Sequence, residues 1–340
     1  SNTLLFGGNY LFRSTDRGDS WMIISPDLTT NDPALTDPES GGLTRDVTSA
    51  ETHATLITVA ESPVKPGLIW AGSDDGRVHV TRNGGGAWTE VGTNQPSQVQ
   101  GLWVSRVAPS RFAEGRAYVS RDGHRSDDMA PYIFVTEDYG ATWTRISDGL
   151  PAGNSIYVVT EDPKNPNLLY AGSEFGAFVS VDRGQSWGRL GEGLPTVAVH
   201  DLIVHPREGD VIAATHGRSV WILDDVSALQ QLDWAVQSSD VHVFEQKLAT
   251  RWRGISRGAT RGHKLFTGRN PLSIDQVPPG NSPNELQNNA GIHFWVGDGM
   301  AGPATIQIST VDGEHSVTME VDAHEGVNRA WWGLRWAPNA

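Results

Sequence analysis

The octapeptide TEDYGATW at Thr136–Trp143 has three close relatives elsewhere in the chain. All four have a hydroxyl residue, an Asp or Asn two places later, a Gly at the fifth place and a closing Trp. The other three are STDRGDSW at Ser14–Trp21, TRNGGGAW at Thr81–Trp88 and SVDRGQSW at Ser180–Trp187. The Asp or Asn oxygen can accept backbone N–H bonds and the Gly supplies a positive φ, so the phrase is typical of a tight turn. A repeated phrase predicts a repeat architecture, because one unit alone cannot bury its apolar face.

Short apolar strands surround each phrase in the same order. Upstream of the fourth phrase, SIYVVTEDP ends at Pro163 and LLYAGS begins at Leu168. Each unit reads as strand, proline turn, strand, glycine loop, strand, phrase and strand, and successive closing tryptophans lie between 44 and 67 residues apart. A fifth unit at Asp201–Asp225 keeps this order without the phrase. A four-stranded meander repeated at this interval predicts an all-β fold of β-propeller blades.

The phrases resemble the Asp-box, or BNR, repeats of sialidase-like and sortilin (VPS10)-like propellers. The segment ATHGRSVWILDD at Ala214–Asp225 resembles the last blade of bacterial proteins labelled glycosyl hydrolase. In that superfamily the boxes lie on the face away from the ligand, so the resemblance implies architecture rather than catalysis. It implies a structural role for the box residues Asp16, Asn83, Asp138 and Asp182.

Three segments are predicted along the chain. Residues 1–245 hold about five blades, the first of them incomplete; residues 246–289 form a basic, Gly-rich linker; residues 290–340 form a partial β-sandwich. Because an open propeller would expose sheet edges, we expect further blades from the same or another chain. The alternative is a small five-bladed ring whose last sheet is completed by a distant strand, such as VHVFEQ at Val241.

Composition narrows the classes of function. The formal net charge is −14, and residues 1–245 alone carry −15, which argues against nucleic acid as a partner. The chain contains no cysteine, so disulfides and thiolate metal sites are excluded. No run approaches the ~20 apolar residues of a membrane span. These features agree with a secreted or cell-envelope protein.

The loops between the second and third strands of each unit, and the crossings between units, are expected on the face opposite the phrases. Two carboxylates there could cleave a glycosidic bond, one as acid and one as base or nucleophile. The candidates are Asp75 and Glu174, with Glu51 as a third. A sialidase is disfavoured, since no Phe-Arg-Ile-Pro-type motif is present. The candidate ligand-binding residues on the same loops are Asp74, His124, Arg125, Phe175, His216 and Arg218.

No cofactor is indicated by the sequence. The oxygen-rich loops would suit Ca²⁺, although no twelve-residue calcium loop is present. His200 and His205 lack the helical spacing of a zinc pair, so no metal site is predicted. The function predicted is recognition of a glycan or a protein partner, as part of a larger chain or assembly. Glycoside hydrolysis of a polysaccharide through paired carboxylates is the alternative.

Overall fold

The computed structural model describes residues 2–36, 47–48, 51–191, 193–249, 289–334 and 336. The chain divides into two compact units, Ser1–Leu223 and Asp224–Ala340, called here the blade unit and the C-terminal unit. Most of the predicted linker, residues 250–288, lies outside the described residues. Within the described ranges, the helices are too short to cross a membrane.

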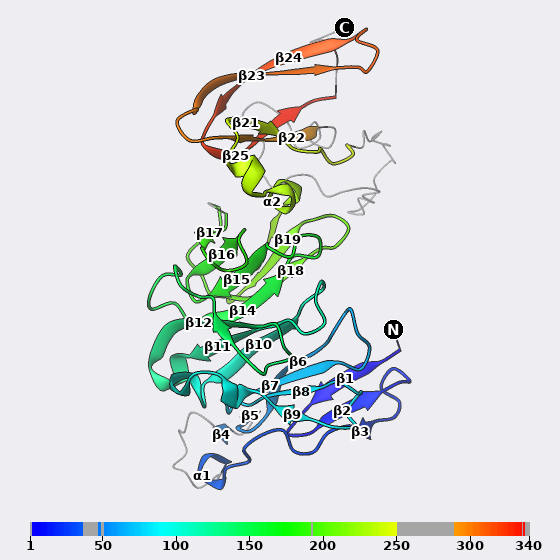
Figure 1. Ribbon diagram of the computed structural model, residues 1–340, viewed down its shortest axis with the longest axis vertical. Helices are drawn as coiled ribbons and strands as arrows, with labels where there is room; N and C mark the ends of the chain where they lie inside the picture. Colours follow the sequence, from blue (N-terminus) through cyan, green and yellow to red (C-terminus); the bar gives the residue numbers. More distant parts are fainter. Residues whose placement is uncertain are drawn as a thin grey trace, which may run out of the picture. The chain divides into compact units, whose positions relative to one another are not determined.

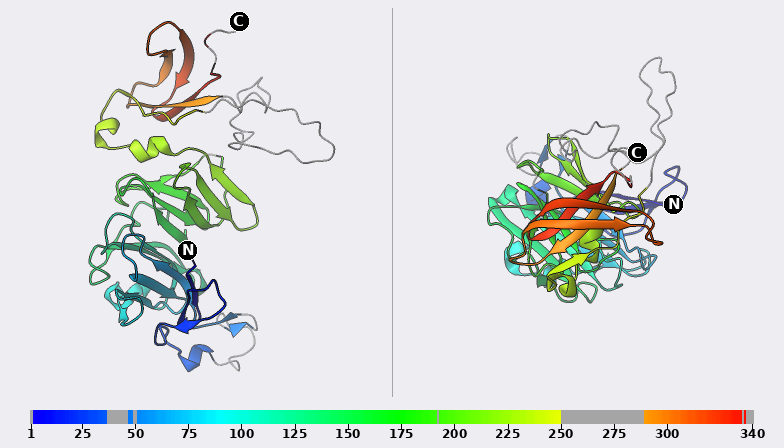
Figure 2. Two further views of the ribbon diagram at one scale, coloured as in Figure 1. Left: turned by 90° about the vertical axis from the view of Figure 1, so that its right-hand side faces the viewer. Right: turned by 90° about the horizontal axis from the view of Figure 1, so that it is seen from above.

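The blade unit is a succession of antiparallel sheets in which strands adjacent in sequence are adjacent in the sheet. Figure 1 and the left view of Figure 2 show these blades following one another from blue to green. The predicted all-β class of propeller blades is confirmed. Blade 1 contains β1 (Leu4–Gly7), β2 (Leu11–Ser14) and β3 (Met22–Ile23), and blade 2 contains β6 (Leu56–Glu61), β7 (Ile69–Ser73), β8 (Val78–Thr81) and β9 (Thr89–Glu90).

Blades 3 and 4 also have four strands each, and blade 5 has three in the described residues. Short elements lie in the crossings and loops: α1 (Pro33–Thr36), β4 (Val47–Thr48), β5 (Glu51–Thr52), η1 (Gly92–Asn94), η2 (Ser97–Val99) and η3 (His124–Ser126). The strands of blades 3 to 5 are β10 (Trp103–Pro109), β11 (Ala117–Gly123), β12 (Asp128–Thr136), β13 (Thr144–Arg145), β14 (Ile156–Glu161), β15 (Leu169–Ser173), β16 (Gly176–Ser180), β17 (Gly188–Arg189), β18 (Val199–Val204), β19 (Val211–Thr215) and β20 (Val220–Leu223).

Each phrase folds into the same hydrogen-bonded turn. In the third phrase, Thr136 Oγ1 accepts from the Gly140 N–H and donates to Asp138 Oδ1, both at 2.8 Å. The same oxygen of Asp138 accepts from the Thr142 N–H at 2.8 Å. Hydrogen bonding, chiefly from the Thr142 backbone, holds the pKa of Asp138 below its usual range. The matching side-chain pairs in the other phrases are Ser14 with Asp16, Thr81 with Asn83, and Ser180 with Asp182.

In the second, third and fourth phrases, the closing Trp joins its blade to the preceding one. Its indole N–H donates to the backbone carbonyl of the aliphatic residue that directly follows the last strand of that blade. The pairs are Trp88 with Ile24 at 2.8 Å, Trp143 with Val91 at 3.0 Å and Trp187 with Ile146 at 2.7 Å. A single local motif therefore also fixes the packing between blades.

The Gly at the fifth place of these three phrases lies against the same aliphatic residue of the preceding blade. Gly140 has a φ of +87°, and a Cβ built there would lie 2.6 Å from Val91 Cβ. At Gly85 it would lie 2.3 Å from the Ile24 carbonyl oxygen, and at Gly184 2.9 Å from Ile146 Cβ. Glycine is thus required twice, for its backbone conformation and for the approach of the preceding blade.

Apolar side chains fill the space between consecutive blades. Between blades 2 and 3, residues from both sheets form one buried cluster that the Trp143 ring covers. Burial of this kind contributes roughly 1.5–3 kcal/mol for each large aliphatic or aromatic side chain. The cluster contains Trp70, Val80 and Val91 of blade 2 and its crossing, and Val104, Ala117 and Val119 of blade 3.

The C-terminal unit begins with α2 (Ser227–Gln231) and α3 (Trp234–Gln237) and continues as two small antiparallel sheets. Phe294 and Val296 of one sheet pack against Ala323 of the other. Side chains of both sheets also line a hollow of about 680 Å³. The sheets are β21-β22-β25 and β23-β24, with bounds β21 (Val241–Val243), β22 (Ala290–Val296), β23 (Gly302–Ser309), β24 (Ser316–Ala323) and β25 (Gly326–Trp332).

Replacing the phrase glycine should cost more than replacing a loop glycine of similar backbone conformation. Gly140→Ala combines positive-φ strain with overlap against Val91, and we expect a loss of about 3 kcal/mol. Gly153 has a φ of +70° with open space around it, so Gly153→Ala should cost about 1 kcal/mol. Urea unfolding of the two variants gives the comparison. Equal losses would show that the overlap with the preceding blade is not real.

Candidate functional site

Six side chains from three blades meet on the face opposite the phrases. They come from the end of β11, from the loops between the second and third strands of blades 3, 4 and 5, and from the second residue of the first strands β14 and β18. We call this group the rim cluster. It consists of Asp122, His124, Tyr157, Glu174, His200 and His216.

Planar rings form a row through the rim cluster. The Tyr157 and His200 rings are stacked, with centroids 4.3 Å apart and planes 20° apart. His124 meets the other side of the row edge-on, 6.3 Å from Tyr157. His216 follows His200 at 5.3 Å in a tilted arrangement. His124, His200 and His216 are exposed, whereas Tyr157 is half-buried.

Two carboxylates form hydrogen bonds with rings of this row, Asp122 with His124 and Glu174 with Tyr157. Asp122, which is buried, has Oδ2 2.5 Å from His124 Nδ1 and accepts the His124 backbone N–H at Oδ1. Glu174 accepts a hydrogen bond from the Tyr157 hydroxyl at Oε2. Burial and the bond to Glu174 raise the pKa of Tyr157, which suits a hydroxyl that stays protonated and donates a hydrogen bond. Burial and the nearby His216 lower the pKa of His200, which favours its neutral imidazole.

β-bulges direct the two central rings into the cluster. In blade 4, Ile156 pairs with Ser173 and Val158 with Gly172, so Tyr157 has no paired residue on β15. In blade 5, Val199 pairs with Thr215 and Asp201 with Ala214, which leaves His200 in the same position. A bulge re-aims the side chain of the extra residue. The bulges therefore interrupt the regular alternation of side chains at Tyr157 and His200, the two residues at the centre of the row of rings.

A buried arginine supports the loop that carries Asp122 and His124. Arg121 donates from Nε to Gln95 Oε1 at 2.6 Å, and from Nη1 to the carbonyls of Gly76 and Leu102 at 3.0 and 2.9 Å. These partners are uncharged, and burial lowers the pKa of Arg121 to about 10. A buried cation held by carbonyls ties the loop of blade 2 to the start of blade 3.

Three further predicted ligand-binding residues, Arg125, Phe175 and Arg218, are sequence neighbours of rim-cluster residues. The Arg125 guanidinium lies 3.9 Å above the Trp103 ring, and Trp103 pairs with Asp122 in the sheet. Phe175 is exposed directly after Glu174. Arg218 follows His216 by two residues and is exposed, and its carbonyl accepts from the Trp221 indole. The structure thus brings His124, Glu174 and His216 into one group, with Arg125 and Phe175 beside it.

The predicted carboxylates of blade 2 are not part of this group. Asp75 is buried and accepts from the Thr30 N–H at 2.5 Å, from the Thr30 hydroxyl at 2.8 Å, and from Ser73. Asp74 is also buried, accepts from the Thr55 N–H at 2.8 Å and has a pKa that burial raises. Both therefore fasten the crossing between blades 1 and 2. Glu51 begins β5, and its side chain lies outside the described part of the chain.

No metal centre emerges from the described ranges, which contain no group of three His, Asp or Glu able to hold an ion. Among the oxygen-rich loops, the Asp74–Asp75 turn already uses its carboxylates in hydrogen bonds from Thr30 and Thr55.

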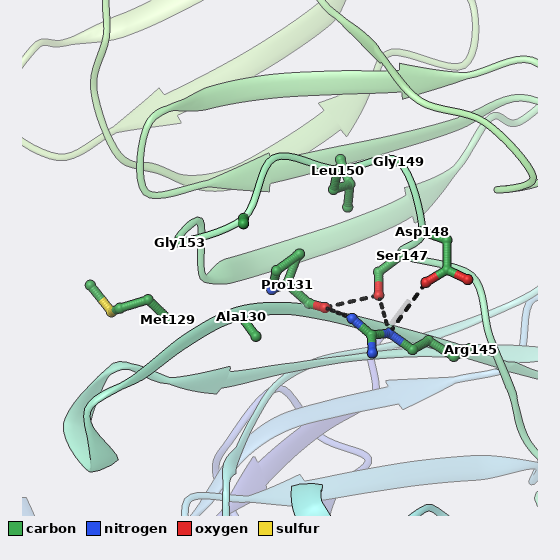
Figure 3. Close-up of a pocket in the computed structure, with 10 residues that line it drawn as sticks. Met129, Ala130, Pro131, Arg145, Ser147, Asp148, Gly149, Leu150 and Gly153 are labelled. Atoms are coloured by element: carbon green, nitrogen blue, oxygen red, sulfur yellow. Dashed lines mark hydrogen bonds and ion pairs between the residues drawn. The ribbon is translucent and has the colours of Figure 1, made fainter.

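A second hollow of about 460 Å³ lies where β12 and β13 meet the crossing to blade 4 (Figure 3). Its polar groups bind one another: Arg145 donates to Ser147 Oγ at 2.9 Å and to the Pro131 carbonyl at 3.1 Å, and Ser147 donates to the same carbonyl. A ligand would have to replace these internal bonds. The rim cluster is the better candidate because three of its rings, those of His124, His200 and His216, are exposed.

Removing the Asp75 carboxylate should destabilise the blade unit. Asp75→Ala leaves the Thr30 N–H and the Thr30 and Ser73 hydroxyls without their acceptor, and we expect a loss of about 1–3 kcal/mol. Asp148→Ala, at an exposed side chain, is the control and should change stability by less than about 0.5 kcal/mol. Thermal and urea unfolding measure both. An Asp75→Ala protein as stable as the control would contradict the structural role.

No protein-family model matches the chain. A curated relative, the oligoxyloglucan-reducing end-specific xyloglucanase of Emericella nidulans, is 27% identical over 117 residues, which cover 32% of this chain and 13% of that enzyme. The chain therefore spans only a small part of the relative's length.

Two solved structures illustrate the likeness in three dimensions. The GH74 xyloglucanase from Xanthomonas campestris is 22% identical, with a TM-score of 0.49 over 65% of this chain and 34% of that one. The structure of YCF48 bound to D1 peptide is 15% identical, with a TM-score of 0.40 over 70% of this chain and 66% of that one. This chain is similar to both and spans about a third of the xyloglucanase.

Proposed function

We propose that the blade unit is the recognition domain of a secreted or cell-envelope protein and binds a glycan at the rim cluster. The observation that supports this best is the row of rings from three blades, with His200 and His216 exposed and the Tyr157 hydroxyl held by Glu174. Sugar recognition needs planar apolar faces beside polar groups of fixed geometry. Further blades, from the same or another chain, would complete the propeller around this site.

A glycan suits the rim cluster better than a protein partner does. A stable protein interface buries about 800 Å² on each side around an apolar centre. The rim cluster is instead a short row of amphipathic rings with carboxylates beside it. The curated relative is named for action on oligoxyloglucan, so neutral xyloglucan oligosaccharides are the first ligands to test.

Glycoside hydrolysis is the second candidate, and one observation favours it. Asp122 and Glu174 both act electrostatically on Tyr157 and on His200, so two carboxylates lie beside the same pair of rings. Such a pair could serve as acid and base across a glycosidic bond. Asp75, fastened by Thr30, is replaced by Asp122 as the partner of Glu174 in this proposal.

Loss of a ring from the row should weaken glycan binding. We expect His200→Ala and Tyr157→Ala each to reduce affinity for xyloglucan oligosaccharides at least tenfold in calorimetric titrations, because each removes one ring of the stacked Tyr157–His200 pair and leaves the other without support. His205→Ala is the matched control, since His205 directly follows the other end of β18. Equal affinities for all three variants would contradict binding at the rim. A wild-type protein that binds no oligosaccharide of a broad panel would favour the protein-partner alternative.

Hydrolysis and recognition can be separated at Glu174. If the chain cleaves glycosidic bonds, Glu174→Gln should lower the release of reducing ends at least 100-fold while oligosaccharide affinity changes less than threefold. Tyr157→Phe keeps the stacking ring and should retain oligosaccharide affinity. Binding by the wild-type protein without any release of reducing ends would eliminate the hydrolase proposal and leave the recognition proposal standing.

A further inference from the structure

The register of the sheets identifies equivalent positions in the first four blades. The residue opposite the hydroxyl residue of the phrase is Leu4 in blade 1, where it pairs with Ser14. Two residues later on the same strand comes Phe6, whose side chain shares a face with Leu4. The counterparts of Leu4 are Ile69, Ala117 and Leu169, and those of Phe6 are Ala71, Val119 and Ala171.

These equivalent positions differ sharply in exposure. In blades 2, 3 and 4 all six counterparts are 0 or 1% exposed, because the preceding blade covers them. In blade 1, Leu4 is 45% and Phe6 62% exposed. Trp21, which closes the first phrase, is 45% exposed and lies edge-on to Phe6 at 6.0 Å. Leu4, Phe6 and Trp21 form an apolar surface that we call the leading face.

The first phrase also lacks the bond that the other three make. The Trp21 indole N–H donates to the Gly18 carbonyl within its own turn at 3.1 Å, whereas the other three tryptophans reach the preceding blade. A Cβ at Gly18 would meet only Leu4 and Trp21, at 3.7 and 3.8 Å. Yet Gly18 has a φ of +104° and the same turn geometry as its counterparts. Blade 1 is therefore shaped for a contact that no described residue makes.

We propose that the leading face binds a further blade of the same repeat, which lies immediately before blade 1 in the polypeptide. The repeat itself identifies this partner. Blades 1, 2 and 3 each cover the surface of the next blade that is equivalent to the leading face. The covering residues are Ile24, Val91 and Ile146. The partner blade ends in an aliphatic residue whose carbonyl accepts the Trp21 indole N–H and whose side chain lies over Gly18. The inference goes beyond glycan recognition and does not depend on it.

The test extends the chain with its own sequence. Leu4 corresponds to Leu169 in register, so a copy of residues 103–168 joined directly to Leu4 supplies a complete blade ending at Ile146 and an innermost strand for blade 1. The readout is exchange of the Trp21 indole N–H in ¹⁵N NMR spectra, assigned by Trp21→Phe. We expect at least tenfold slower exchange than in the unextended chain. A copy carrying Ile146→Asp is the control and should restore fast exchange.

A second extension with a different junction controls for misfolding at the point where the copy is joined to Leu4. Ala117 also corresponds to Leu4, so a copy of residues 56–116 joined to Leu4 offers a blade ending at Val91. Protection of Trp21 by either extension supports the proposal, and failure of both overturns it. Sedimentation of the unextended chain tests the other occupant: self-association that Phe6→Asp abolishes would assign the leading face to a second copy and overturn the proposal. A monomer supports it.

Discussion

The hydrogen bond from a phrase tryptophan to the preceding blade, made over a glycine, is the interaction on which the structure depends. It couples a local turn to long-range packing, because the residues that form the turn also set the distance between sheets. Blade 4 is fixed to blade 3 in this way through Trp187 and Ile146. Asp122 and His124 on blade 3 thereby come within reach of Tyr157 and Glu174 on blade 4.

Blade 5 has no phrase, and other contacts fasten it. The Arg106 guanidinium of β10 binds the Asp201 carboxylate of β18 at 2.6 Å, past the intervening blade 4. At Gly172 a Cβ would lie 2.6 Å from the Val199 carbonyl, so β15 and β18 approach closely there. These contacts position His200 against Tyr157. The two faces of the blade unit thus have different roles. Regular turns stabilise the fold on one face, and irregular loops and bulges form the candidate site on the other.

The parts of the structure that repeat could be predicted from sequence, because spacing alone encodes them. The four phrases predicted the turns and the succession of sheets, and the loop positions pointed to His124, Glu174 and His216. Tyr157 and His200 were missed as site residues because they lie inside apolar strands, where alternation assigns them to the sheet. Their bulges depend on pairing with β15 and β19, which one strand cannot reveal. Asp75 looked available in a turn, but the Thr30 crossing buries it, a tertiary contact without a local signal.

Hydrogen exchange of the tryptophan indole N–H groups in the unextended chain tests the central claim most directly. The account predicts that Trp88, Trp143 and Trp187 exchange only with the unfolding of their blades, while Trp21 exchanges at least tenfold faster, since its partner is a carbonyl of its own exposed turn. Similar exchange rates for all four groups would show that the closing tryptophan does not join one blade to the next.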